Sequence, residues 1–125
     1  AIPVLTLADH RLKTDERGVV NVGPEVKSVT ISFDASTIPE ASKTMLEISN
    51  PNSWFEHYSG TFRDDSQSEH ALFSKIYPVV STDQTPLDLN KIKTSGFYQI
   101  RLCAVDQSNK IKGYFSDPIV FQITR

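Results

Sequence analysis

The alternation of side chains over residues 97–105 constrains the fold of this chain more than any other feature. The even-numbered residues from Tyr98 to Ala104 fall on one face of an extended chain, and the odd-numbered residues from Phe97 to Cys103 fall on the other. Residues 87–96, which precede this run, are rich in turn formers. Because a turn followed by a long alternating run is typical of an antiparallel sheet, we expect this strand to lie in a β-sandwich.

Short β-rich runs, separated by turn residues such as Gly, Pro, Asn and Asp, recur along the rest of the chain. They cover residues 4–7, 18–22, 26–33, 44–49, 54–62, 71–80 and 118–124. No segment keeps a helical period, and residues 38–42 are long enough for only a single helical turn. We therefore predict an all-β fold, an antiparallel β-sandwich of about seven or eight strands.

The first 25 residues depart from a regular strand pattern. A charged stretch, residues 9–17, separates the β-rich runs 4–7 and 18–22. We interpret these two runs as one split first strand or as an edge hairpin. A chain of 125 residues has the size of one domain. We expect a single β-sandwich domain over residues 1–125, with residues 1–25 as an atypical N-terminal strand or hairpin extension.

The composition argues against membrane insertion and against nucleic-acid binding. Hydrophobic residues make up 38% of the chain, and the longest apolar runs are far shorter than the roughly 20 residues that a membrane-spanning helix needs. The formal net charge of −2 gives no general attraction for nucleic acid, which is normally bound by a clustered basic surface. We expect a soluble domain that binds no nucleic acid.

Residues that carry chemistry are sparse and scattered. Cys103 is the only cysteine, which excludes an internal disulfide and a multi-cysteine metal site, and we interpret it as a thiol on a strand. His10, His57 and His70 are far apart, and no nucleophile elbow, phosphate-binding loop or zinc-protease motif occurs. The acidic segment 63–69 lacks the spacing of a calcium-binding loop and fits a solvated turn. We expect no enzyme activity, no cofactor and no metal site.

Four segments, residues 29–33, 87–98, 98–105 and 116–124, together resemble the fibronectin type III superfamily and, more loosely, immunoglobulin-like sandwiches. In this resemblance residues 29–33 correspond to the second strand, with Phe33 where a core Trp is usual. Residues 87–98 correspond to the crossing between strands E and F. The last two segments correspond to strands F and G.

The resemblance implies structural roles for Phe33, Tyr98, Ile100 and Leu102. Tyr98 corresponds to the tyrosine-corner residue, whose ring is buried and whose hydroxyl bonds to the backbone a few residues upstream. Ile100 stands where a disulfide-bearing immunoglobulin domain has its second cysteine, which favours the fibronectin type III branch. Residues 1–25 and 52–80 depart from the family pattern, so we expect the particular features of this domain to lie there.

The aromatic cluster within residues 54–62 is the candidate binding surface. It contains Trp54, Phe55 and Tyr58, with His57 between them. Exposed rings bind sugar faces or protein partners because they offer a large apolar area at low entropic cost. A sandwich of this size also needs aromatic residues in its core, and core packing remains the competing interpretation.

These observations favour a non-catalytic structural or protein-interaction module of a larger secreted, cell-surface or virion protein. Its partner is then another protein or a neighbouring domain of the same chain. The alternative is a carbohydrate-binding module that uses the exposed aromatics of residues 54–62. The chain begins Ala1-Ile-Pro-Val, without an initiator Met, which we interpret as the start of a processed product or of a piece of a longer protein.

Overall fold

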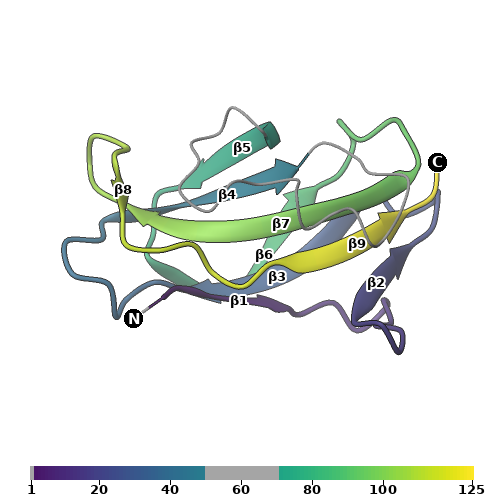
Figure 1. Ribbon diagram of the computed structural model, residues 1–125, viewed down its shortest axis with the longest axis horizontal. Helices are drawn as coiled ribbons and strands as arrows, with labels where there is room; N and C mark the ends of the chain where they lie inside the picture. The colour runs from purple at the N-terminus through teal and green to yellow at the C-terminus, as the bar shows by residue number, and fades with distance from the viewer. Residues whose placement is uncertain (1, 50–70) are drawn as a thin grey trace.

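The computed structural model describes residues 2–49 and 71–125, which form nine strands in two sheets packed as a sandwich (Figure 1). The smaller sheet has the order β1-β3-β6, with β1 at Val4–Leu7, β3 at Ser28–Asp34 and β6 at Ser81–Asp88. The larger sheet has the order β2-β9-β7-β4-β5, with β2 at Val19–Val22, β9 at Ile119–Ile123, β7 at Gly96–Val105, β4 at Lys43–Ser49 and β5 at Ala71–Tyr77. A two-residue strand, β8 (Ile111–Lys112), pairs with β7.

The predicted all-β sandwich is therefore confirmed, and two of its details are wrong. The described residues already form more strands than the seven or eight expected, and the sheets are not wholly antiparallel, because β2 runs parallel to β9. The strand predicted at residues 54–62 lies outside the described residues.

Alternating side chains build the core between the two sheets. On β3, Val29, Ile31 and Phe33 point inward, while the residues between them are half-buried. The core cluster contains buried side chains from both sheets: Val20, Val22, Val29, Ile31, Phe33, Leu46, Ile48, Tyr77, Leu87, Leu89, Ile92, Tyr98, Ile100, Leu102, Phe121 and Ile123. Because each fully buried large apolar side chain stabilises the fold by about 1.5–3 kcal/mol, this cluster is the main source of stability.

The N-terminal segment is divided between the two sheets. β1 pairs antiparallel with β3, whereas β2 pairs parallel with β9 in the other sheet. Asp9 fixes the crossing, because its carboxylate accepts hydrogen bonds from Arg11 and from Thr30 N on β3. The Arg11 guanidinium holds the pKa of Asp9 well below its usual range. β1 and β2 do not pair with each other as a hairpin, which fits the split-strand interpretation, and a short antiparallel bridge joins Thr14 to Val20.

Two strands are not predicted from the sequence. β6 is rich in Thr, Asp and Gln and contains Pro86, a residue that strands tolerate mainly at the edge of a sheet. β8 is only two residues long and lies within a segment that reads as a connection. Residues 35–41 form consecutive turns in place of a helical turn, with Ile38 N donating to Ala35 O and Ala41 N donating to Ile38 O.

Candidate functional site

The aromatic residues that the sequence singles out for binding, Trp54, Phe55, His57 and Tyr58, lie outside the described residues. The acidic segment 63–69 lies outside them as well. The described surfaces that could bind a partner therefore lie on the two sheets and their connections.

The four residues expected to be structural all lie in the core cluster: Phe33, Tyr98, Ile100 and Leu102. Tyr98 donates its hydroxyl hydrogen to Thr94 O, four residues upstream, over 2.6 Å. Burial raises the pKa of Tyr98, so the hydroxyl keeps the proton that it donates. This contact joins the start of β7 to the connection that precedes it.

The ends of the two sheets meet at a groove. β5 ends the described part of the larger sheet and β6 ends that of the smaller sheet. Between them lies a cavity of about 190 Å³, which we call the edge groove. It is lined by Phe73, Ser74 and Lys75 of β5, by Leu87 and Asp88 of β6, and by Lys91 of the connection that follows.

The pairing of β5 with β4 explains how these side chains reach the groove. Phe73 pairs with Ile48 and Lys75 pairs with Leu46, so both side chains lie on the face of the sheet that turns toward the core. Phe73 packs partly against the core, and Leu87 is fully buried beneath it. Lys75 is exposed at the margin, which lets its charged end reach water while its stem follows the apolar wall.

The electrostatic character of the edge groove is basic. Lys75 Nζ lies 5.0 Å from the centroid of the Tyr77 ring, and Lys91 Nζ lies 5.3 Å from that of Phe73. Within residues 2–49 and 71–125, neither lysine forms an ion pair. The Asp88 carboxylate accepts a hydrogen bond from Asn90 N over 2.8 Å and so stabilises the turn that follows β6. The arrangement offers two ammonium groups beside an apolar wall.

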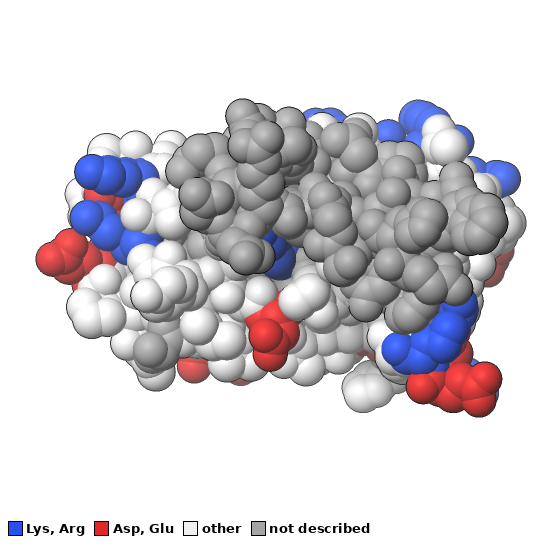
Figure 2. Space-filling view, viewed as in Figure 1, with Lys and Arg blue, Asp and Glu red and all other residues white. Residues whose placement is uncertain are grey.

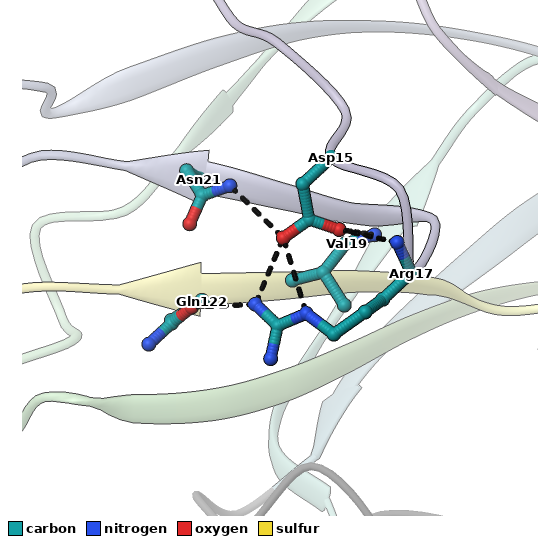
Figure 3. Close-up of polar contacts among 5 residues, drawn as sticks. All are labelled: Asp15, Arg17, Val19, Asn21 and Gln122. Carbon is teal, nitrogen blue, oxygen red and sulfur yellow. Dashed lines mark hydrogen bonds and ion pairs between the residues drawn. The ribbon is translucent and has the colours of Figure 1, made fainter.

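A cluster of polar side chains surrounds Asp15, which lies in the turn before β2 (Figure 3). Its carboxylate accepts hydrogen bonds from Arg17 N, from Val19 N and from the Arg17 guanidinium, and Arg17 Nη2 also donates to Gln122 on β9. The hydrogen bond from the Arg17 side chain is the main reason why the pKa of Asp15 falls to about 2. The cluster joins the turn before β2 to β9, which is a structural task.

The outer face of the larger sheet carries a buried ion pair. Glu47 and Arg101 are directly opposite on β4 and β7, and Arg101 Nη2 lies 2.9 Å from Glu47 Oε1. The Phe115 ring lies against the guanidinium, with its centroid 3.6 Å from Arg101 Cζ. Burial raises the pKa of Glu47, and the hydrogen bond and the charge of Arg101 oppose that rise. Both side chains are buried, so this pair is a structural feature and not a surface for ligands.

Cys103 follows on the same face of β7 and is fully buried in a small cluster with Met45 and Val105. Burial raises the pKa of its thiol to about 12. A thiol that is buried and protonated is a poor nucleophile. Its chemistry in the folded protein is therefore that of a small apolar side chain.

Another hollow of about 190 Å³ lies on the smaller sheet, and polar side chains dominate its lining. It is lined by Val4, Thr6, Ser32, Phe33, Asp34, Thr82 and Asp83. Asp34 accepts hydrogen bonds from the backbone and hydroxyl of Ser36, which lowers the pKa of Asp34. Among the described residues, the lining of this hollow contains two carboxylates, no basic side chain, and less apolar wall than the edge groove.

The charges on the surface are mixed in sign. Figure 2 shows Lys and Arg side chains next to Asp and Glu side chains at both ends of the face drawn. Among the described residues, no group of three or more His, Cys, Asp or Glu side chains is placed to hold a metal ion. In the same part of the chain, no helix is long and apolar enough to cross a membrane. No family model, no curated protein and no solved structure matches this chain.

Proposed function

We propose that this chain is a non-catalytic protein-interaction module, similar to a fibronectin type III domain, within a larger secreted, cell-surface or virion protein. The observation that carries the proposal is the edge groove, where two sheet ends meet beside an apolar wall and two lysines without ion partners in the described chain. Strand edges bind partner segments through their backbone groups, and a neighbouring groove then selects side chains.

The arrangement of strands supports the fibronectin type III resemblance. β3 lies in one sheet, while β7 and β9 pair in the other, as the second, sixth and seventh strands of such sandwiches do. The hydrogen bond from Tyr98 to Thr94 O supports it too. The parallel pairing of β2 with β9 is a departure that places part of the N-terminal segment in the larger sheet.

The shape of the sandwich suits a module in a longer chain. β1 begins near one end of the long axis, and β9 ends at the opposite end (Figure 1). A domain with this path spaces its neighbours along the axis, and in the described part of the chain β5 and β6 end their sheets at its side. The edge groove lies at that lateral position, between β5 and β6.

Site-specific photo-crosslinking tests the proposal. A benzophenone amino acid replaces Leu72, an exposed residue of β5, or Val4, an exposed residue of β1 that serves as the matched control. Each protein is irradiated in an extract of the cells or particles that carry it. We expect an adduct at position 72 that is absent at position 4 and that an excess of the unlabelled protein prevents. Identical adducts at both positions, or none at position 72, contradict the proposal.

A further inference from the structure

We infer, on the basis of the proposed function, that the edge groove binds an extended acidic segment of a partner protein in which glutamates alternate with aliphatic residues. The segment adds as a further strand to the edge of β5 that has no partner strand among residues 2–49 and 71–125. Its glutamates face Lys75 and Lys91, and its aliphatic side chains face the exposed Ile76 on the other side of β5.

The two faces of β5 set this alternation. On the outer face, Ile76, which pairs with Met45, is 36% exposed. Leu72, which is 40% exposed, lies where the register of β5 against β4 shifts. The opposite face carries Phe73, Lys75 and Tyr77. Because successive side chains of an added strand point to opposite faces, one set meets Ile76 and the other set meets the lysines. An apolar–acidic alternation matches both faces at once.

The size of the edge groove favours a side chain over a free small molecule. Sites for small molecules usually enclose about 300–1,000 Å³, and the edge groove encloses about 190 Å³. A glutamate side chain of the partner matches the lining of the edge groove. Its methylene stem packs on Phe73 and Leu87, and its carboxylate reaches the two lysine ammonium groups. Asp88 lies in the lining, but two lysines outweigh its single charge, and its carboxylate already caps the turn at Asn90.

The strand to which the segment adds is β5 and not β6. β6 contains Pro86, which has no N–H to donate, and it carries the acidic residues Asp83 and Asp88. Acidic residues on β6 repel an acidic segment. β5 contains no proline and no acidic residue, and its one charged residue is Lys75. Lys75 therefore selects among strands, because it opposes a cationic segment and attracts an anionic one.

A second copy of this chain is a poorer occupant. Pairing of β5 with its own copy brings Lys75 and Lys91 of both molecules to one edge, where like charges repel. The net formal charge of −2 is too small to reverse this local repulsion, since charges farther apart than about 10 Å are screened at ordinary salt. The charge of the groove therefore points to a different, acidic chain.

Binding of two matched peptides tests the inference. Fluorescein-labelled ten-residue peptides of alternating Val and Glu, or alternating Val and Lys, are titrated with the protein, and ¹⁵N amide shifts locate the contact. We expect the glutamate peptide to bind about tenfold more tightly than the lysine peptide, as two partly exposed ion pairs allow. Its shifts fall on β5 and on residues 87–91, and added salt weakens its binding.

Charge reversal makes the test specific to the edge groove. The double variant Lys75→Glu/Lys91→Glu is expected to prefer the lysine peptide. The control double variant Lys13→Glu/Lys110→Glu makes the same change in net charge at exposed positions elsewhere and is expected to keep the original preference. Retention of the fold in each variant is checked by its dispersed amide spectrum.

The outcomes separate the inference from the proposed function. If both peptides shift the groove residues equally, the acidic partner is wrong and the interaction module stands. If neither peptide shifts them, the inference and the groove as a docking site both fail. If light scattering shows a dimer and β5 amides shift with protein concentration alone, a second copy replaces the acidic partner.

Discussion

The outward side chains of β3 in the smaller sheet and of β7 in the larger sheet differ in burial. On β3 of the smaller sheet, Ser28, Thr30 and Ser32 are half-buried, as an alternating strand predicts. On β7 of the larger sheet, Gln99 is 5% exposed and Arg101 is 6% exposed. Alternation therefore predicts which way a side chain points, and it leaves open whether that side faces water.

The polar groups on these two faces find hydrogen-bond partners in different ways. Hydroxyl groups on β3 remain close to water and need no protein partner. On the larger sheet, burial requires partners, since an unpaired buried polar group is costly. Glu47 and Arg101 pair across the strands, and the backbone N of Gln99 donates to Ser49 Oγ over 2.8 Å. We expect substitutions on the larger sheet to have much larger effects than matched substitutions on the smaller one.

The largest expected difference is in thiol reactivity. Cys103 is buried with a pKa of about 12, and Cys at position 32 replaces a half-buried serine. At pH 8 the thiolate fraction of Cys103 is lower than that of an ordinary cysteine by about three orders of magnitude. We expect the variant Ser32→Cys/Cys103→Ala to react with Ellman's reagent at least that much faster than the wild type. Similar rates for the variant and the wild type mean that thiols on the two outer faces are equally accessible to the reagent.

The next largest effect is expected from Arg101→Leu, which leaves Glu47 buried without its charged partner. Breaking a buried pair in this way costs about 3–5 kcal/mol, and urea denaturation measures the loss. The double variant Glu47→Leu/Arg101→Leu is expected to recover most of it, because it removes both charges of the pair. The surface pair of Lys112 and Glu40 is the control, and Lys112→Leu costs less than about 1 kcal/mol. Equal losses for the two single variants contradict the comparison.

Ser49→Ala removes the acceptor for the buried Gln99 backbone N–H on the larger sheet. A buried donor left without a partner costs about 1–3 kcal/mol. We expect a loss of this size in the free energy of unfolding, and Ser49→Thr, which keeps the hydroxyl, is the conservative control. A loss below about 0.5 kcal/mol, typical of surface substitutions, means that this amide has another partner.

Tyr98→Phe tests the side of β7 that faces the core. The change removes the hydrogen bond to Thr94 O and keeps the ring, so we expect a loss of about 1 kcal/mol in the free energy of unfolding. A loss larger than that of Arg101→Leu reverses our ranking of the two faces of β7. No measurable loss argues against a tyrosine-corner role for this residue.

The sequence predicts the strands whose side chains alternate between apolar and polar. Phe33, Tyr98, Ile100 and Leu102 all face the core. The alternation over residues 26–33 indicates this for Phe33, and the family resemblance implies it for the three residues of β7. β6 is missed because its polar composition and Pro86 resemble a loop, and it pairs through its backbone to β3. The local sequence pattern of β6 does not show that its backbone pairs with β3.

The edge groove is not predicted because it joins residues that are distant in sequence. Lys75 and Lys91 belong to a strand and to a later connection, and only the meeting of the two sheet ends brings them together. A weak signal exists in β5 itself, an apolar strand with a single lysine on its inner face. The prediction of a binding surface at Trp54, Phe55, His57 and Tyr58 lies outside the described residues and stays a prediction.

The smallest effect is expected from Ser32→Ala on the smaller sheet. The Ser32 hydroxyl lines the polar hollow of that sheet and forms no hydrogen bond within residues 2–49 and 71–125. Substitutions of this kind change stability by at most about 0.5 kcal/mol, which urea denaturation resolves from the larger loss in Ser49→Ala. The two serines differ in the sheet that carries them, in their burial, and in the hydrogen bond that Ser49 accepts. Equal losses at both positions mean that the hydroxyl face of β3 is also held by hydrogen bonds, and the contrast between the sheets then disappears.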